Sequence, residues 1–466
     1  MTQSPEKVFV PPWISCRTYL FGQEESRTYI ANEKMHTYVL LEGLASDMWK
    51  LLLDNTSRDE LTSWAENCGV SDQVEDFLAD LEKQGLICRG QANDVAKAAY
   101  EPFSSDEHSD EEKKFIEEMQ AWLFEKKFLF STFFELTYNC NLKCVHCYNP
   151  KNTAALEIDF DLCKKAIDDA YDLGCFRITF SGGEATLHTR FSELVGYARN
   201  KRMSVEIFTN GQTLAKNGKL YGDLLKLYPY RICVSLYSTD KEMHERVTDV
   251  GGSFENTYSL IHRLRKDNVN VQIKNFLLNF NCMDCIKVKN MARDICATSV
   301  ADISLIPTIE GDKKTMRYVL DEGELFELYT NPESPLYIGT DFIPLDYDKV
   351  KDEAPCLGGF NVLCVNPDGK VVICVSMPYS VGDLNTSTLK DIWQDAVNAQ
   401  ADSRLYQWQR VRISDCTECY KQDYCAFCNY CPGMGYLENG YLKRSEVLCA
   451  QAKVKMRAYH YLKGKD

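Results

Sequence analysis

The chain has 466 residues, of which 45% are hydrophobic and 26% charged, and its net charge is -15 at pH 7. This length can supply several packed cores, and an acidic chain repels phosphate backbones, so nucleic acid is not an expected partner. No apolar run approaches a membrane span, and the N-terminus lacks a basic start followed by an apolar stretch, so we expect a cytoplasmic protein without a secretion signal. In that reducing compartment the 21 cysteines indicate metal binding rather than disulfides.

Residues 1–90 predict a small α+β unit, because a hairpin pattern is followed by three stretches with helical spacing. Capping residues stand before the second and third stretches, and Gly85 ends the third. The expected elements are strands at Thr28–Ala31 and Thr37–Leu41, and helices at Leu44–Leu53, after Ser57 as far as Asn67, and after Ser71.

Residues 91–130 are interpreted as a linker. The stretch Ser104–Lys114 is polar and charged and carries no core pattern. Phe115–Phe128 is compatible with a short amphipathic helix, but a solvated linker is the interpretation that we favour.

Residues 131–310 alternate strand-like runs with helix-like stretches such as Phe160–Leu173 and Phe254–Lys266. This alternation predicts an α/β fold with a parallel sheet in a full or partial barrel, whose functional groups lie at the carboxyl ends of the strands. Residues 311–349 form a connecting segment, and residues 350–466 are rich in cysteine and short on periodicity. The expected strands are Ser131–Thr137, Phe176–Phe180, Ser204–Thr209, Arg231–Leu236, Val271–Leu278 and Asp302–Ile306.

A cysteine loop, Cys140-Asn-Leu-Lys-Cys144-Val-His-Cys147, follows the first of these strands directly. Three thiolates at this spacing can hold three irons of a [4Fe–4S] cluster and leave the fourth iron open to a small molecule. A structural zinc site is the alternative, but such sites take four ligands. No paired cysteine or histidine set stands nearby in the sequence to supply the fourth.

This loop resembles the signature of the radical S-adenosylmethionine (SAM) superfamily, which implies a partial (β/α)6 TIM-type barrel that binds SAM. The family usually has an aromatic residue before the third cysteine; here it is His146, which we expect to pack against the adenine. The resemblance implies that an external electron donor, such as flavodoxin or ferredoxin, reduces the cluster. SAM is then cleaved to a 5′-deoxyadenosyl radical that removes a hydrogen from the substrate. We identify no general base from the sequence.

Three further segments carry the same resemblance. Ser181-Gly182-Gly183-Glu184 follows the second strand and matches the segment that binds the methionine amino group of SAM, with Glu184 available for the charge. Ser235 ends a later strand and matches the residue that contacts the ribose, although a buried serine bonded to the backbone is nearly as good an interpretation. Thr209-Asn210-Gly211 resembles a strand-end motif of the family, and an ordinary turn is its default interpretation.

The cysteines of residues 350–466 resemble a SPASM domain, which implies two auxiliary [4Fe–4S] clusters and therefore three clusters in all; zinc ribbons are the alternative. The family pattern assigns Cys356, Cys374 and, less directly, Cys364 to the first auxiliary cluster. One more ligand is expected, and the chain offers Cys428 or Cys431; the Pro-Gly that follows Cys431 favours it, and the choice stays open. The second auxiliary cluster would have Cys416, Cys419, Cys425 and Cys449 as ligands.

The remaining cysteines include a spaced pair, Cys282-Met-Asp-Cys285. A redox or metal pair is one interpretation, but no second pair lies near it. We therefore expect these two, like most of the others, to be small core residues.

The N-terminal unit, with its ending Leu81–Ile87, resembles a PqqD-like winged helix-turn-helix, the recognition element for ribosomally made, modified peptides (RiPPs). The resemblance implies binding of a precursor's leader segment by addition of a strand to a sheet edge. DNA binding is the alternative, but the stretch Ser71–Gln84 carries several acids and one lysine.

Together these resemblances imply a peptide-modifying radical SAM enzyme, with thioether formation between a peptide cysteine sulfur and a Cα or Cβ as the favoured reaction. Other radical oxidations of a peptide or protein remain open: carbon–carbon cross-linking, decarboxylation and formylglycine formation. A leader-binding scaffold without catalysis is a third hypothesis, against which the intact cysteine loop and Gly-Gly-Glu argue.

Overall fold

The computed structural model describes residues 8–21, 25–35, 37–54, 56–89, 110–149, 156–346, 358–359, 361–398, 423–441 and 443–464. In the described part of the chain, no helix is long and apolar enough to span a membrane.

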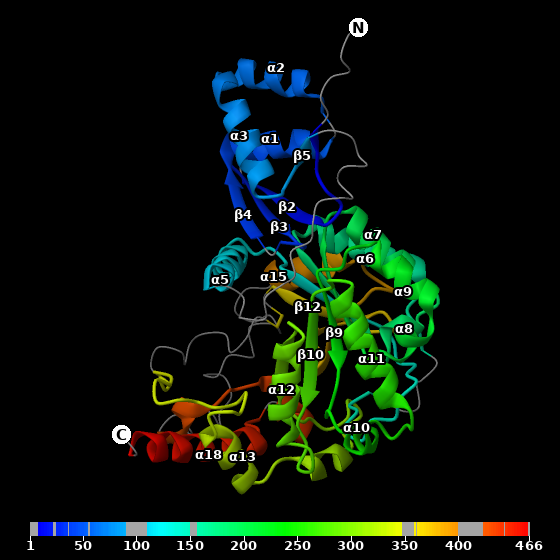
Figure 1. Ribbon diagram of the computed structural model, residues 1–466, viewed down its shortest axis with the longest axis vertical. Coiled ribbons are helices and arrows are strands. Elements are labelled where there is room, and N and C mark those ends of the chain that lie inside the picture. Colours follow the sequence, from blue (N-terminus) through cyan, green and yellow to red (C-terminus); the bar gives the residue numbers. More distant parts are fainter. Residues whose placement is uncertain are drawn as a thin grey trace.

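The centre of the molecule is a 9-stranded sheet with the order β11-β10-β9-β8-β7-β6-β12-β13-β14 (Figure 1). The strands β6 to β11 are parallel and adjacent in chain order, which is the arrangement that strand–helix alternation predicts. Their bounds are Ser131–Thr137 (β6), Arg177–Gly182 (β7), Ser204–Thr209 (β8), Arg231–Ser235 (β9), Val271–Phe276 (β10) and Thr298–Asp302 (β11).

The last of the expected strands was misplaced. Residues Thr298–Asp302 form β11, whereas the prediction put the strand at Asp302–Ile306. The apolar run of the prediction, Leu305 and Ile306, is buried in loop structure instead. Burial without strand pairing therefore produced the same sequence signal as a strand.

Helices cover the outer face of the parallel sheet (Figure 1). Buried aliphatic side chains from alternate strand positions meet the apolar faces of these helices in one large core. The other face of the strands is consequently free for polar residues. The helices are α6 (Phe160–Asp172), α7 (Phe191–Asn200), α8 (Gln212–Lys216), α9 (Gly218–Leu225), α10 (Lys241–Thr248), α11 (Ser253–Lys266) and α12 (Asp284–Asp294), with the 3₁₀ turn η3 (Ala185–Leu187).

The N-terminal unit has a 3-stranded antiparallel sheet, β2-β3-β4, packed against three helices. The predicted hairpin and helices are confirmed, and Ser57 forms a capping box with Glu60. Ser71 does not cap the third helix, because residues Ser71–Gln73 form a 3₁₀ turn before it. The elements are β1 (Val8–Phe9), β2 (Ile14–Phe21), β3 (Glu25–Asn32), β4 (Thr37–Glu42), α1 (Gly43–Leu53), α2 (Arg58–Cys68), η1 (Ser71–Gln73), α3 (Val74–Lys83) and β5 (Cys88–Arg89).

This unit lies against the amino-terminal ends of the barrel strands (Figure 1). Arg199, at the end of α7, donates to the Pro12 carbonyl (2.8 Å) and to Ser15 Oγ (2.5 Å). Tyr19 donates to the Gly174 carbonyl, which precedes β7, at 2.7 Å. The backbone N–H of Cys16 on β2 donates to the Arg202 carbonyl at 2.9 Å. The outer edge of β2 is therefore occupied by the barrel.

The linker prediction for residues 91–130 was wrong for its second half. Asp110–Glu125 form a helix, α5, whose Met119 and Leu123 are fully buried. They pack with aromatic residues of the N-terminal sheet and with Phe176 of the barrel. Residues 90–109, which contain most of the charged stretch, lie outside the described residues.

The C-terminal region extends the central sheet, because β12 pairs in parallel with β6 and starts an antiparallel hairpin arrangement with β13 and β14. The long helix α18 packs against α13 in a separate core, which also contains Cys282 and Cys285. That burial confirms the pair as core residues. The elements are η4 (Lys313–Tyr318), α13 (Glu322–Thr330), β12 (Val362–Val365), β13 (Lys370–Cys374), β14 (Met377–Asp383), α15 (Leu389–Asn398), η7 (Asp423–Phe427), α17 (Pro432–Asn439) and α18 (Glu446–Lys463).

Candidate active site: a cysteine loop at the carboxyl ends of the strands

The cysteine loop leaves the carboxyl end of β6, at the opposite end of the barrel from the N-terminal unit. Its backbone is held by the end of α10: Lys143 N–H donates to the Thr248 carbonyl, and Val145 N–H to the Val247 carbonyl, both at 3.0 Å. The three thiols of Cys140, Cys144 and Cys147 are each partly exposed. The loop therefore presents its sulfurs on a fixed backbone at the open end of the barrel.

Gly182 and Gly183 are required by the close approach of two backbone segments. A Cβ on Gly182 would meet the Thr137 carbonyl oxygen, and Gly182 also has a φ of +127°. A Cβ on Gly183 would lie 2.6 Å from the Tyr138 carbonyl oxygen. Gly183 N–H donates to the Thr137 carbonyl at 2.6 Å. The two glycines thus let the segment between β6 and Cys140 pass directly over the end of β7.

Glu184 lies beneath this crossing, with 1% of its surface exposed. One carboxylate oxygen accepts from Thr186 Oγ1 (2.5 Å) and Thr209 Oγ1 (2.7 Å), and the other accepts from Asn210 N–H (2.7 Å). Burial raises the pKa of the carboxyl group, and these donors oppose that effect. The carboxylate is thus held in place by donors of the protein, and the sequence prediction that its charge serves the methionine amino group of SAM stays a prediction.

Asn210 connects Glu184 with the cysteine loop through hydrogen bonds. Its side-chain amide donates to Asn141 Oδ1 at 2.8 Å and approaches Cys140 Sγ at 3.6 Å. The turn that the sequence left as a default interpretation, Thr209-Asn210-Gly211, is therefore part of the site. Hydrogen bonds to ligating sulfurs are one of the means by which proteins tune iron–sulfur clusters.

An aromatic wall closes the loop on the side of β10. The ring of His146 stacks on Phe276 (centroids 5.0 Å apart, 13° between planes) and meets Tyr237 edge-on at 5.0 Å. Burial lowers the pKa of His146 to about 4, so the imidazole is neutral near pH 7. The hydroxyl of Tyr237 lies 3.9 Å from Cys144 Sγ. Ser235, at the end of β9, lies beside this wall in sequence and on the strand next to β10.

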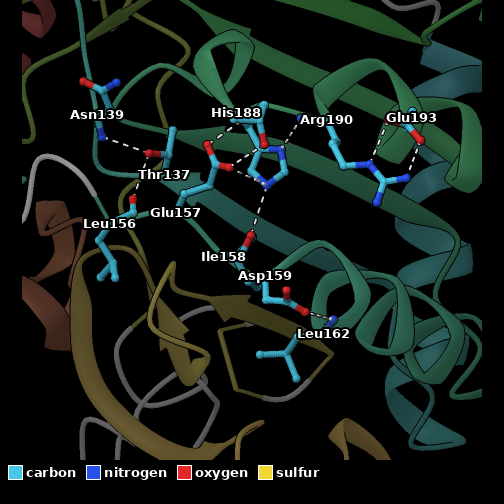
Figure 2. A network of polar contacts seen from close by, with 11 residues as sticks. Thr137, Asn139, Leu156, Glu157, Ile158, Asp159, Leu162, His188, Arg190 and Glu193 are labelled. Atoms are coloured by element: carbon cyan, nitrogen blue, oxygen red, sulfur yellow. Dashed lines mark hydrogen bonds and ion pairs between the residues drawn. The ribbon is translucent and has the colours of Figure 1, made fainter.

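Figure 2 shows the polar contacts that hold the chain where it returns from the cysteine loop. Thr137 Oγ1 donates to the Leu156 carbonyl (2.8 Å) and accepts from Asn139 N–H (3.0 Å). His188 Nε2 lies 3.1 Å from the Ile158 carbonyl oxygen. Both the entry and the exit of the loop are therefore tied to the end of β6 and to the turn after Gly-Gly-Glu. His188 was missed, although its place four residues after Glu184 was a usable signal.

A second buried carboxyl group that the sequence did not single out is Glu135 of β6. It accepts a hydrogen bond from the hydroxyl of Tyr148 at 3.0 Å, and burial raises its pKa to about 7. Tyr148 follows Cys147 directly and packs, as Cys428 and Cys431 do, against one small buried cluster that contains Met434 and Leu437. Tyr148 thus connects the first cysteine loop with two of the C-terminal cysteines.

The described C-terminal cysteines lie on different elements. Cys364 is fully buried on β12, Cys374 ends β13, Cys425 lies in η7 and Cys449 in α18. A Cβ on Gly433 would meet the Ser376 carbonyl oxygen, so the turn after Cys431 lies against the turn after Cys374. The choice between Cys428 and Cys431 as a fourth ligand stays open. Cys356, Cys416 and Cys419 lie outside the described residues.

Comparison with known proteins identifies both cysteine-bearing regions. Residues 134–282 match the radical SAM superfamily, and residues 356–432 match the SPASM iron–sulfur cluster-binding domain. The protein is a radical SAM enzyme. It is 28% identical over 344 residues to the antilisterial bacteriocin subtilosin biosynthesis protein AlbA of Bacillus subtilis, covering 69% of this chain and 70% of that protein.

One further sequence and one solved structure are also similar to this protein. The radical SAM enzyme is 25% identical over 330 residues to an AdoMet-dependent heme synthase of Methanosarcina barkeri, covering 65% of this chain and 93% of that protein. Among solved structures, Streptococcus suis SuiB bound to its precursor peptide SuiA matches with a TM-score of 0.55 at 14% identity, over 95% of this chain and 99% of that one. The likeness to SuiB shows a shared overall fold.

Radical SAM and SPASM domains use [4Fe–4S] clusters and SAM, and the residues of the loop fit such a cluster. Burial raises the pKa of Cys140 to about 11, and burial together with the neighbouring thiols of Cys147 and Cys140 raises the pKa of Cys144, so ionising these thiols has a free-energy cost. Iron offsets that cost by binding the thiolates. Asn210 and Tyr237 place hydrogen-bond donors beside two of the sulfurs, as metal-bound sulfurs require.

Substituting Gly183 by Ala is expected to reduce SAM cleavage about a hundredfold, because the added Cβ displaces the backbone that carries Cys140. Gly222→Ala in α9 is the matched control, since a Cβ there meets nothing within 4 Å. Iron content and SAM cleavage under dithionite measure the effect. Equal rates in the two variants would contradict this account of the glycine.

Proposed function

We propose that this enzyme matures a ribosomally made precursor peptide by forming intramolecular thioethers between a cysteine sulfur and a Cα or Cβ. The observation that carries the proposal is the combination of a cysteine loop at one end of the barrel with a separate sheet unit docked at the other end. A separate sheet unit with an open edge can hold one part of an extended peptide while another part reaches the cysteine loop. Support comes from AlbA, named for bacteriocin biosynthesis, and from the fold of SuiB, solved with a precursor peptide.

In this proposal residues 1–90 bind the leader of the precursor. The β2-β3-β4 sheet has two edge strands, and β2 lies against Arg202 of the barrel. Within the described residues β4 pairs with β3 alone. An extended leader can therefore add to the sheet at β4, with main-chain hydrogen bonds supplying affinity.

The cysteine loop and the residues around it have separate proposed roles at the other end of the barrel. Cys140, Cys144 and Cys147 hold the first cluster, which with SAM supplies a radical that removes a hydrogen from the peptide. Gly182 and Gly183 shape the subsite for the methionine amino group, while Glu184 fixes the turn at Asn210. His146 and Tyr237 form an apolar wall that excludes water at the adenosine side, and Ser235 contacts the ribose.

The C-terminal cysteines complete the proposed cofactor set. Two auxiliary clusters make three in all, the first with Cys356, Cys364, Cys374 and Cys431 as its candidate ligands. The second has Cys416, Cys419, Cys425 and Cys449. The proposed electron donor that reduces the first cluster is a flavodoxin or a ferredoxin.

The test is a reaction of reconstituted enzyme, SAM and dithionite with candidate precursors, which are short cysteine-containing peptides encoded beside the gene. We expect a mass loss of two hydrogens for each thioether and a cysteine that no longer reacts with iodoacetamide. Added leader peptide should compete with the full precursor for binding. It should not change the rate of SAM cleavage that is measured without the precursor. A two-hydrogen loss with the cysteine still reactive would favour a carbon–carbon cross-link, and loss of carbon dioxide would favour decarboxylation.

The N-terminal unit and the cysteine loop lie at opposite ends of the barrel. Their separation predicts a minimum number of residues between the leader of the precursor and the residue that is modified. The seven residues of β6 separate them, and an extended chain advances about 3.3 Å per residue, so about 23 Å must be bridged. Precursors with fewer than about seven residues between the two segments should bind with unchanged affinity but lose modification. A deletion series measured by binding and by mass checks this, and full modification of a three-residue spacer would contradict it.

A further inference from the structure

The inner face of β10 carries residues that the proposed roles do not use. Val271 and Ile273 point into the core beneath the helices, so Gln272, Lys274 and Phe276 alternate onto the opposite face. Phe276 is the residue that stacks on His146 of the cysteine loop. Lys274 therefore lies on the same face as the loop, about 7 Å deeper along the strand.

The ammonium group of Lys274 forms no direct ion pair among the described residues, although the carboxylate of Glu206 attracts it at longer range. Its contact is with the ring of Phe208, whose centroid lies 5.2 Å from Nζ. The acid nearest to it on this face, Glu206, already accepts from Arg231 Nε (2.8 Å) and from Thr179 (3.2 Å). The ammonium group therefore keeps its hydrogen-bond donors free of a directly bound carboxylate, and a carboxylate of a ligand could form a charge-assisted hydrogen bond with it.

The place of Lys274 in the sheet is open to a large ligand. On one side it pairs in register with Val300 of β11, the last strand of the sheet, whose side chain is 39% exposed. On the other side it pairs with Ser235 of β9. Lys274 thus stands between the open edge of the barrel and the residue proposed to contact the ribose of SAM.

We infer that Lys274 binds a carboxylate of the substrate peptide, from an Asp or Glu close to the residue that is modified. The inference rests on the proposed function. SAM is the other source of a carboxylate, but its amino and carboxylate groups share one carbon. The subsite proposed for the amino group is on β7, three strand spacings or about 14 Å from β10. The peptide is therefore the better partner.

The experiment compares wild-type holoenzyme with Lys274→Gln, and uses Lys226→Gln as the matched control because the Lys226 side chain is 79% exposed. The probes are the candidate precursor and its variants in which each Asp or Glu is replaced singly by Asn or Gln. Lys274→Gln should raise the KM of the precursor about tenfold, as loss of a charge-assisted hydrogen bond does, and leave the Kd of SAM within about twofold. Lys274→Arg should retain most of the affinity.

One acid-to-amide variant of the peptide should show the same tenfold loss with the wild-type enzyme and no additional loss with Lys274→Gln. An unchanged precursor KM in Lys274→Gln overturns the inference. A tenfold weaker SAM affinity with an unchanged peptide KM assigns the carboxylate to SAM and also overturns it. A wild-type enzyme that modifies no candidate precursor contradicts the proposed function itself, whereas the preceding results leave that function standing.

Discussion

Replacing Cys140, Cys144 and Cys147 together by Ala is expected to reduce SAM cleavage to background and to remove about one third of the bound iron. Four irons per cluster give about twelve in the fully reconstituted protein with three clusters. The three thiols share one loop that contacts the barrel end, so their loss leaves the C-terminal cysteines untouched. Iron analysis after anaerobic reconstitution and an assay of 5′-deoxyadenosine measure both effects.

The matched control is Cys68→Ala, because Cys68 is an exposed cysteine on α2 in the N-terminal unit. It should leave iron content and SAM cleavage unchanged. Iron near a single cluster in the fully reconstituted wild-type protein, or zinc as its main metal, would contradict the three-cluster proposal.

The second large effect is expected from the double substitution of Cys356 and Cys374 by Ala, which should abolish the cross-linked product while some SAM cleavage persists. Closing a thioether from a carbon radical and a thiol releases one proton and one electron, and in the proposed function the first auxiliary cluster would accept that electron. Hydrogen removal depends instead on the first cysteine loop. Incubation with SAM, dithionite and precursor, followed by assays of 5′-deoxyadenosine and peptide mass, separates the two steps.

Metal binding and folding are coupled, so this variant needs a structural control. Circular dichroism and the spectrum of the first cluster should match those of the wild type, since Cys374 ends β13, which does not adjoin β6, the strand that leads into the first cysteine loop. Normal loss of two hydrogens from the peptide would show that the first auxiliary cluster is not needed for closure.

Glu184 and Lys274 differ in how far the sequence alone identifies them. Glu184 stands in a recognisable segment, and its charge was assigned to SAM from that segment alone. Its partners within the protein include Thr209 and Asn210, which come from the end of the next strand along the chain, and parallel pairing of β7 and β8 brings them together. Lys274 stands in no motif. The alternation of β10 against a located core, and the lack of a direct ion pair among the described residues, single it out.

The sequence by itself determined the elements whose signals are local. The pattern of apolar residues predicted the bounds of β6 and β8 to the residue, and the capping residue Ser57 predicted the correct start of α2. The spacing of Cys140, Cys144 and Cys147 indicated the chemistry, because three ligands on one short loop need no information from the rest of the fold.

Tertiary structure alone decided the features that depend on contacts between distant segments. A charged stretch before residue 110 suggested a solvated linker, yet α5 buries Met119 and Leu123 against two other units. The docking of Tyr19 on Gly174 places the leader-binding candidate at the far end of the barrel from the cysteine loop. Neither outcome has a local signal, because an amphipathic helix or an exposed aromatic ring reads the same in sequence whether its apolar face meets solvent or another part of the chain.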